Sequence, residues 1–341
     1  MSPSPPRLAF VVSSPRSGST LLERMLETHS QVLGGPEPHL MTPLAHLGVW
    51  ANADRAPYDI NGASEALRAF VNQLPCGEAD YYRSIRAYAD TLYGRWHATR
   101  PDGLVCLDKT PAYALVLPFL ERVYPDAAYI ALTRHPLATF ASYANSFFDG
   151  DYAAAHEYNP ILERYVPALA AFVRDSATNR LHIRYEDLVA EPEAWLRRIC
   201  EHWGIPYEPA MVTYGAKAKS RPEGLGDPIG VAQHDRPVTA SVDKWAVDLA
   251  RKPEALRLMQ GVIERLAPDD LATLGYPVET LWAPLEAARA QSPPEPPKGW
   301  NRYRLQRLAI VRLRAAVRGI PPMRAAVRGV RRACEAVLPP E

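Results

Sequence analysis

The sequence predicts an α/β protein in which helices flank a P-loop-like parallel sheet, followed by a basic helical C-terminal tail. Short apolar runs typical of buried strands lie near residues 7–14, 103–108, 127–133 and 180–185. Segments with the apolar spacing of helices alternate with these strands, near residues 18–29, 84–98, 137–148, 160–175 and 192–203. This alternation is typical of parallel strands joined by helices that pack on the faces of the sheet.

The first strand leads into a turn and a helix start whose residue types favour an anion. The apolar run 9–12 is followed by Ser13-Ser14-Pro15-Arg16-Ser17-Gly18-Ser19-Thr20, after which a helical apolar stripe begins. The unpaired N–H groups and the dipole at a helix N-terminus both favour negative charge. Arg16 adds a guanidinium whose donors suit phosphate or sulfate oxygens. The loop differs from a nucleoside-triphosphate P-loop, because Ser13 replaces the first glycine and Ser19 replaces the lysine.

The segment 15–20 resembles the phosphosulfate-binding loop of sulfotransferases that use 3′-phosphoadenosine 5′-phosphosulfate (PAPS). The resemblance implies that the 5′-phosphosulfate is held by Arg16, Ser17, Gly18, Ser19 and Thr20. Without further context, the same segment is an ordinary strand–turn–helix capped by serines. Arg134 ends a later predicted strand, and Ser142 follows it by eight residues on the next helix. In this family such a pair holds the 3′-phosphate, whereas a surface ion pair and a solvated helix position are the alternatives.

Two further residues match the family pattern around the nucleotide. Tyr185 begins a Tyr-Glu-Asp-Leu segment, and in the family this tyrosine approaches the nucleotide. Lys244, followed by Trp245, resembles the Lys-Trp pair that closes the nucleotide site in the tyrosylprotein branch, where the lysine meets a phosphate. A packed tyrosine at the edge of the core and an exposed lysine are the alternatives. The Gly- and Pro-rich segment 220–236, with His234, is expected to cover the nucleotide or the acceptor.

The same resemblance suggests residues for the transfer chemistry. Glu37 lies in a Pro-Glu-Pro-His-Leu segment and is the first choice for the base that deprotonates an acceptor hydroxyl, with His39 second. A surface carboxylate is the alternative for Glu37. Lys109 lies in a strand-end Asp-Lys-Thr-Pro segment and is expected to stabilise the leaving group beside Arg16, unless it forms only a surface pair. We expect no metal, because the nine histidines and four cysteines show no metal-ligand spacing.

Length and cysteine usage limit the class of protein. A chain of 341 residues can bury one large core or two smaller ones. No apolar segment reaches the roughly 18 residues of a membrane span. The scattered cysteines, without a CxxC pair, suit reduced thiols. We therefore expect a cytoplasmic protein.

Composition changes near the C-terminus. We expect a sulfotransferase domain over 1–290, a Pro-rich linker over 291–300 and an Arg-rich amphipathic tail over 301–341. The tail carries ten arginines and two acidic residues, a charge of +8, so the whole-chain charge of +1 leaves −7 for the remainder. The tail is expected to contact an anionic membrane surface or an acidic partner, or else to pack on the acidic body or form a disordered arm. We expect no nucleic-acid binding, because the tail has few aromatic residues.

These motifs predict a PAPS-dependent sulfotransferase that acts on a small-molecule or carrier-bound alcohol. Residues 42–83 are expected to form helices and loops around the acceptor. One rival is an ATP-dependent P-loop kinase, which would require Gly-Lys-Ser/Thr in the loop. The other rival is a non-catalytic nucleotide-binding module tethered by its basic tail.

Overall fold

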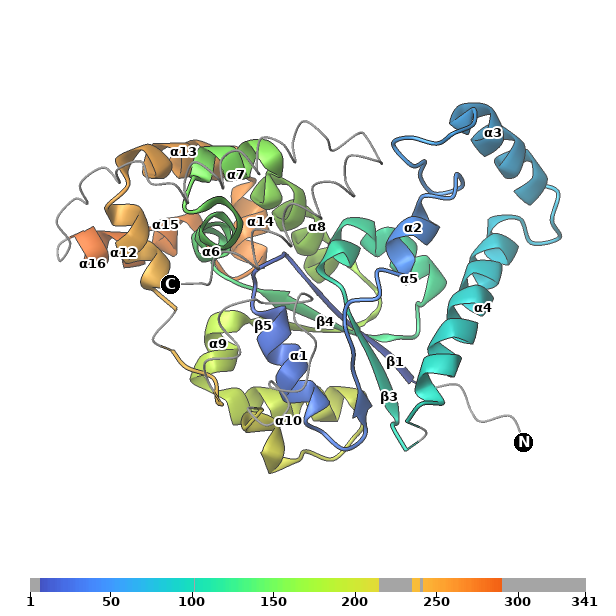
Figure 1. The fold of residues 1–341 in the computed structure, drawn as a ribbon, viewed down its shortest axis with the longest axis horizontal. Coiled ribbons are helices and arrows are strands. Elements are labelled where there is room, and N and C mark those ends of the chain that lie inside the picture. Colours follow the sequence, from blue (N-terminus) through green and yellow to red (C-terminus); the bar gives the residue numbers. More distant parts are fainter. Residues whose placement is uncertain (1–6, 101, 215–234, 240–241, 290–341) are drawn as a thin grey trace, which may run out of the picture.

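The computed structural model describes residues 7–100, 102–214, 235–239 and 242–289. Its centre is a five-stranded parallel sheet with strand order β2-β3-β1-β4-β5 (Figure 1). The strands are β1 (Arg7–Ser13), β2 (Val32–Leu33), β3 (Val105–Lys109), β4 (Ala128–Thr133) and β5 (Asn179–Arg184). The predicted α/β class and its four predicted strands are confirmed. The expected linker, the expected tail and His234 lie outside the described residues.

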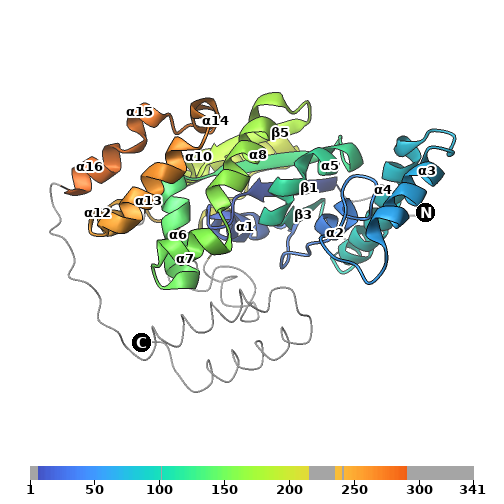
Figure 2. The same ribbon diagram turned by 90° about the horizontal axis from the view of Figure 1, so that it is seen from above.

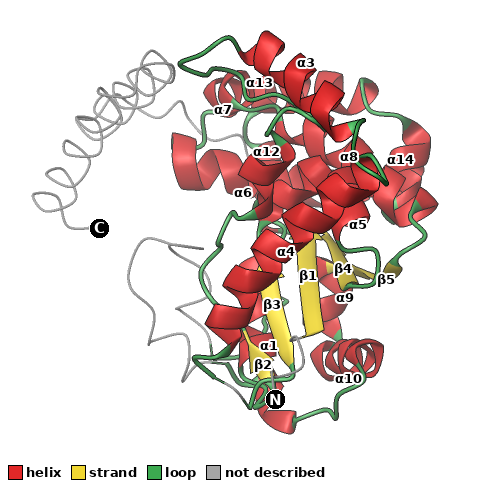
Figure 3. Cartoon of the chain, turned by 90° about the vertical axis from the view of Figure 1, so that its right-hand side faces the viewer, coloured by secondary structure: helices red, strands yellow, loops and turns green. Residues whose placement is uncertain are grey.

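Helices occupy most of the chain between and after the strands (Figure 3). Those before β4 are α1 (Ser19–Glu27), α2 (Met41–Ala45), α3 (Ile60–Val71), α4 (Glu78–His97), the 3₁₀ helix η1 (Pro111–Val116) and α5 (Leu117–Val123). Between β4 and β5 lie α6 (Pro136–Phe148), α7 (Tyr152–Tyr158) and α8 (Ile161–Asp175). After β5 follow α9 (Tyr185–Ala190), α10 (Pro192–Trp203), η2 (Pro209–Val212), α12 (Lys244–Ala250), α13 (Pro253–Glu264), α14 (Pro268–Thr273), α15 (Val278–Leu281) and α16 (Ala283–Arg289).

The sheet separates two hydrophobic cores because successive side chains of a strand point to opposite faces. On β1, Phe10 and Val12 join the larger core with α2, α4 to α8 and α12 to α16. Ala9 and Val11 join the second core, which is formed with α1, α9 and α10. All four residues are essentially inaccessible to solvent. Strand β1 therefore reads as a continuous apolar run, as expected for a strand that is covered on both faces.

The order of the strands locates the functional edge of the sheet. Strand β1 pairs with β3 on one side and β4 on the other, so the chain changes direction across the sheet at β1. In open parallel sheets, ligands bind at such a switch point, beyond the carboxyl ends of the strands. The loop between β1 and α1 lies at this point, and β3 and β4 end beside it.

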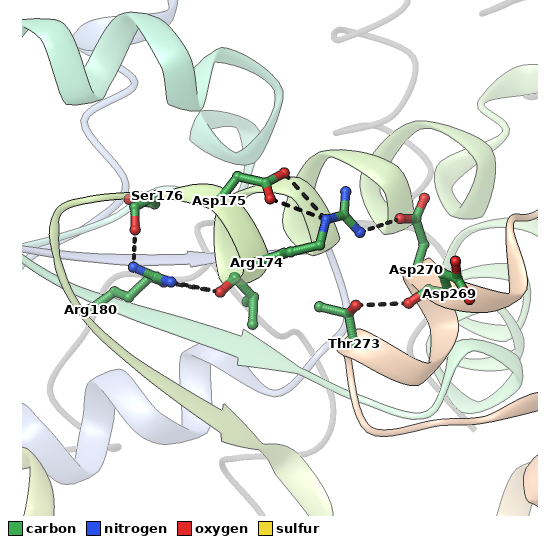
Figure 4. Close-up of polar contacts among 8 residues, drawn as sticks. Arg174, Asp175, Ser176, Arg180, Asp269, Asp270 and Thr273 are labelled. Atoms are coloured by element: carbon green, nitrogen blue, oxygen red, sulfur yellow. Dashed lines mark hydrogen bonds and ion pairs between the residues drawn. The ribbon is translucent and has the colours of Figure 1, made fainter.

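Each end of the molecule is formed by a group of helices that lies beyond the edge of the sheet. Figure 2 shows α3 and α4 at one end and α12 to α16 at the other. The second group is joined to the α8–β5 corner by polar contacts, including the pair in which Arg174 of α8 donates to Asp270 of α14 at 3.1 Å (Figure 4). At the same corner, Arg180 at the start of β5 donates to the Val173 carbonyl at 2.9 Å. No helix in the described part of the chain is both long and apolar enough to cross a membrane.

Candidate functional site

The loop between β1 and α1 has a backbone that few residues adopt. Arg16 has a φ of 69° and Gly18 has a φ of 88°, both in the left-handed region. A Cβ on Gly18 would lie 2.3 Å from the Tyr185 ring, so a hydrogen atom is required at this position. No side chain of the described residues caps α1 at Gly18. The first N–H groups of the helix therefore face the loop without a competing side-chain acceptor.

Arg134 connects the end of β4 to this loop. Its Nη1 donates to the Arg16 carbonyl at 3.2 Å, and its guanidinium lies over the Tyr185 ring with a distance of 4.4 Å to the ring centroid. The Nε of Arg134 is buried and has no hydrogen-bond partner among the described residues. A buried N–H without a partner costs free energy, so the site fits an anionic group that would accept from it.

Arg16 reaches across to α6, the helix that follows β4. Its Nε donates to the Ser142 hydroxyl at 3.3 Å, and its guanidinium lies 5.7 Å from the centroid of Phe147. Ser142 is on the second turn of α6, as predicted. The structure thus brings Arg16, Arg134, Ser142 and Tyr185 into one cluster, although they come from four separate segments.

Lys109 ends β3 close to the same edge and pairs with two carboxylates. Its Nζ donates to Oε1 of Glu37 and lies 3.4 Å from Oε2 of Glu23 on α1. The side chains of Lys109 and Glu23 are each 1% exposed, whereas that of Glu37 is 25% exposed. The second oxygen of Glu37 lies 3.5 Å from Nε2 of His39, whose side chain is half exposed. Glu37 therefore links a buried cation to the solvent-facing side of the site.

A buried network fixes the segment that carries Glu37. Asp108 accepts hydrogen bonds from the hydroxyls of Tyr93 at 2.6 Å, Thr110 at 2.8 Å and Tyr113 at 3.0 Å. The Tyr113 hydroxyl in turn accepts from the N–H of Met41 at 3.1 Å, at the start of α2. Burial raises the pKa of Asp108, and the three hydrogen bonds oppose that rise. The network ties the end of β3 to the segment that carries Glu37 and His39.

A separate polar cluster lies behind Arg134. The His135 ring stacks on Trp245 with ring centroids 4.5 Å apart, and the backbone N–H of His135 donates to Glu186 at 3.0 Å. Tyr276 donates to the other oxygen of Glu186 at 2.7 Å. These residues border a pocket of about 200 Å³. Burial lowers the pKa of His135 to about 4, so its imidazole is neutral at physiological pH.

The model of the sulfotransferase family matches residues 7–209. The chain belongs to the sulfotransferase family. Nodulation protein NoeE of Sinorhizobium fredii is 28% identical over 295 residues, which cover 80% of this chain and 66% of that protein. Protein-tyrosine sulfotransferase 1 of Danio rerio is 23% identical over 216 residues, covering 60% and 55% of the two chains. The chain therefore spans between about half and two thirds of the length of these relatives.

Solved structures of sulfotransferase domains are also similar. The domain from the Synechococcus PCC 7002 olefin synthase shares 28% identity and a TM-score of 0.49, covering 77% of this chain and 96% of that one. The domain from the curacin biosynthetic pathway shares 22% identity and a TM-score of 0.48, covering 80% and 98%.

The candidate site contains most, but not all, of the residues singled out in the sequence. Lys244 is exposed at the first residue of α12, and only its neighbour Trp245 joins the cluster behind Arg134. Two residues were not predicted. Glu23 reads in the sequence as the polar face of a helix, and only the fold places it against Lys109. Burial raises the pKa of the Tyr165 phenol on α8; the charge of Arg164 opposes that rise, and the negative charge of Glu37 adds to it.

Proposed function

We propose that this sulfotransferase transfers a sulfuryl group from PAPS to a hydroxyl of a small-molecule or carrier-bound acceptor. The observation that carries the proposal is the position of Arg134. Its guanidinium lies beside the anion-binding loop, stacks on Tyr185 and keeps a buried Nε without a partner among the described residues. This arrangement suits a second phosphate, apart from the one at the loop, as the 3′-phosphate of PAPS would be.

In this proposal, the loop and the cluster around it bind the donor. Arg16, Ser17, Gly18, Ser19 and Thr20 would hold the 5′-phosphosulfate with backbone N–H groups, hydroxyls and one guanidinium. Arg134 and Ser142 would hold the 3′-phosphate, and Tyr185 would contact the nucleoside. Lys244 remains a proposed phosphate contact.

The transfer itself needs a base and a stabilised leaving group. The acceptor oxygen attacks sulfur, forming a new O–S bond, while the bond between sulfur and the bridging phosphate oxygen breaks and its electrons remain on that oxygen. Glu37 takes the acceptor proton, and His39 is the second candidate for this role. Lys109 and Arg16 stabilise the negative charge that develops on the bridging oxygen, and the proposal includes no metal.

The acceptor class follows from the resemblance of Pro36-Glu37-Pro38-His39-Leu40 and Asp108-Lys109-Thr110-Pro111 to segments of bacterial natural-product sulfotransferases. A cytoplasmic location and a contact of residues 301–341 with a membrane surface or an acidic partner are further parts of the proposal. The tail and the segment 220–234 lie outside the described residues.

The assignment of roles is tested by two variants with opposite expected effects. Arg134→Ala removes a charge-assisted contact and is expected to weaken binding of PAP, the desulfated product, on the order of 10- to 100-fold. Glu37→Gln removes the base while keeping its size, and is expected to spare PAP binding and lower turnover by roughly 100-fold or more. PAP affinity is measured by calorimetry, and turnover by PAP release from PAPS with a panel of alcohols. An equal loss of PAP affinity in both variants would contradict the assignment.

A further inference from the structure

Glu23 is a buried carboxylate that the motifs of the sequence leave without a role. It lies on α1 one turn beyond the anion-binding loop, and its Oε2 is 3.4 Å from Nζ of Lys109. Both side chains are 1% exposed. Burying a carboxylate is costly unless it is paired, and Lys109 supplies the opposite charge.

The position of Glu23 adds negative charge close to a site that is expected to bind anions. That charge repels an anionic donor, so the attraction of the site for anions does not explain why a carboxylate lies there. Lys109, however, has three N–H donors and faces two carboxylates with different exposure. The side chain of Glu37 is partly exposed to solvent, whereas that of Glu23 is almost fully buried.

We infer that Glu23 is a positioning residue, which holds the Lys109 ammonium at the end of β3 throughout the transfer. This inference rests on the proposed function. When Glu37 accepts the proton of the acceptor hydroxyl, it loses its negative charge and its attraction for Lys109. The pair with Glu23 still holds Lys109 in place, so that the ammonium faces the oxygen from which sulfur departs. A misplacement of about 1 Å costs on the order of 100-fold in rate.

The pair of carboxylates also affects how readily Glu37 acts as a base. Without Glu23, Lys109 would have Glu37 as its remaining carboxylate partner among the described contacts, and the ionised form of Glu37 would be held more tightly. Removal of the Glu23 charge also removes a like charge that repels the Glu37 carboxylate through their shared partner Lys109. Both effects move the acidic limb of the pH profile of kcat/KM to lower pH.

The inference is tested with Glu23→Gln and the matched control Glu27→Gln. Glu27 lies four residues later on α1, is also buried, and pairs with Arg24 at 3.7 Å. In Glu23→Gln we expect kcat to fall on the order of 10- to 100-fold, the acidic limb to move to lower pH, and PAP affinity to stay close to that of the native protein. In Glu27→Gln we expect kcat and the pH profile of the native protein.

Two further variants separate positioning from a role in folding alone. Glu23→Asp keeps the charge, and we expect it to fold and to recover part of the lost kcat. A double-mutant cycle of Glu23→Gln with Lys109→Met, followed by thermal unfolding, measures their coupling without the donor, and we expect shifts in Tm that do not add.

Native kcat and a native pH profile in a folded Glu23→Gln protein would overturn the inference, as would additive Tm shifts in the cycle. Loss of PAP affinity equal to the loss of kcat would overturn it too, because Glu23 would then act on the donor site. Failure of the native protein to bind PAP and to turn over PAPS would instead refute the proposed function, whatever Glu23→Gln does.

Discussion

Gly18 is the residue on which the geometry of the loop between β1 and α1 depends most directly. We expect Gly18→Ala to destabilise the protein by about 1–3 kcal/mol, because a Cβ would meet the Tyr185 ring at 2.3 Å and φ is 88°. It should also weaken PAP binding, since Tyr185 and the loop would have to separate. Urea unfolding and calorimetry measure the two effects.

Gly77 provides the control for this prediction. Its φ of 55° is also in the positive region, but a Cβ there would meet nothing within 4 Å. Gly77→Ala therefore reports backbone strain without a steric clash, and it should leave PAP affinity unchanged. Equal losses of stability and of PAP affinity in the two variants would show that contact with Tyr185 does not matter.

At the scale of residues, the sequence predicts a site residue when that residue belongs to a recognisable sequence motif. Arg16, Arg134, Ser142 and Tyr185 do so, and the fold brings them together. Glu23 belongs to no such motif, because a glutamate within an amphipathic helix is most simply read as a solvent-facing residue. Only the packing of α1 against the end of β3 makes it a partner of Lys109.

At the scale of elements, the end of β3 is held by the Asp108 network. We expect Asp108→Asn to destabilise the protein by about 1–3 kcal/mol, because an amide cannot accept from Tyr93, Thr110 and Tyr113 together in the same geometry. Turnover should fall as well, since the Tyr113 hydroxyl also accepts from the N–H of Met41. Urea unfolding and PAP release measure these effects.

Asp126→Asn is the matched control for Asp108→Asn. Asp126 pairs with Arg86 at the surface, where its side chain is 64% exposed, and exposed pairs contribute about 0–1 kcal/mol. A similar loss of stability in both variants would show that the buried network contributes no more than a surface ion pair.

The elements differ in how well the sequence predicts them. The central strands are apolar because both faces are covered, so they stand out as runs. Strand β2 has two residues, too few to form a pattern. The helix expected from residue 84 begins at Glu78, and the helices over 253–289 were not predicted. The path of the segment 34–40 also depends on tertiary packing that the sequence does not reveal. Gly35 lies so close to Trp96 that a Cβ would be 2.8 Å from its ring.

At the scale of the whole molecule, the burial of His135 makes stability depend on pH. Its pKa falls from 6.5 to about 4, so between these values the unfolded chain binds a proton that the folded chain does not. This contribution is complete above about pH 6.5 and is lost as the pH falls toward about 4, by about 3 kcal/mol at 1.36 kcal/mol per unit. His182 shares the direction, since burial also lowers its pKa.

The prediction is that His135→Gln flattens the loss of stability on acidification. Free energies of unfolding in urea are measured at several values between pH 7 and pH 4 for both proteins. His39→Asn, which changes a half-exposed histidine, should keep the native slope. A native slope in His135→Gln would mean that other groups govern the acid response.

The central claim is that this sulfotransferase recognises PAPS through a 3′-phosphate site at Arg134, and calorimetric titration with PAP, ADP and ATP with magnesium tests it most directly. PAP and ADP share the adenosine and a 5′-phosphate, but only PAP carries a 3′-phosphate. The account predicts tight binding of PAP without magnesium and weak binding of ADP, with the difference largely lost in Arg134→Ala. Preference for ATP with magnesium, or equal affinity for PAP and ADP, would contradict it and would favour a kinase.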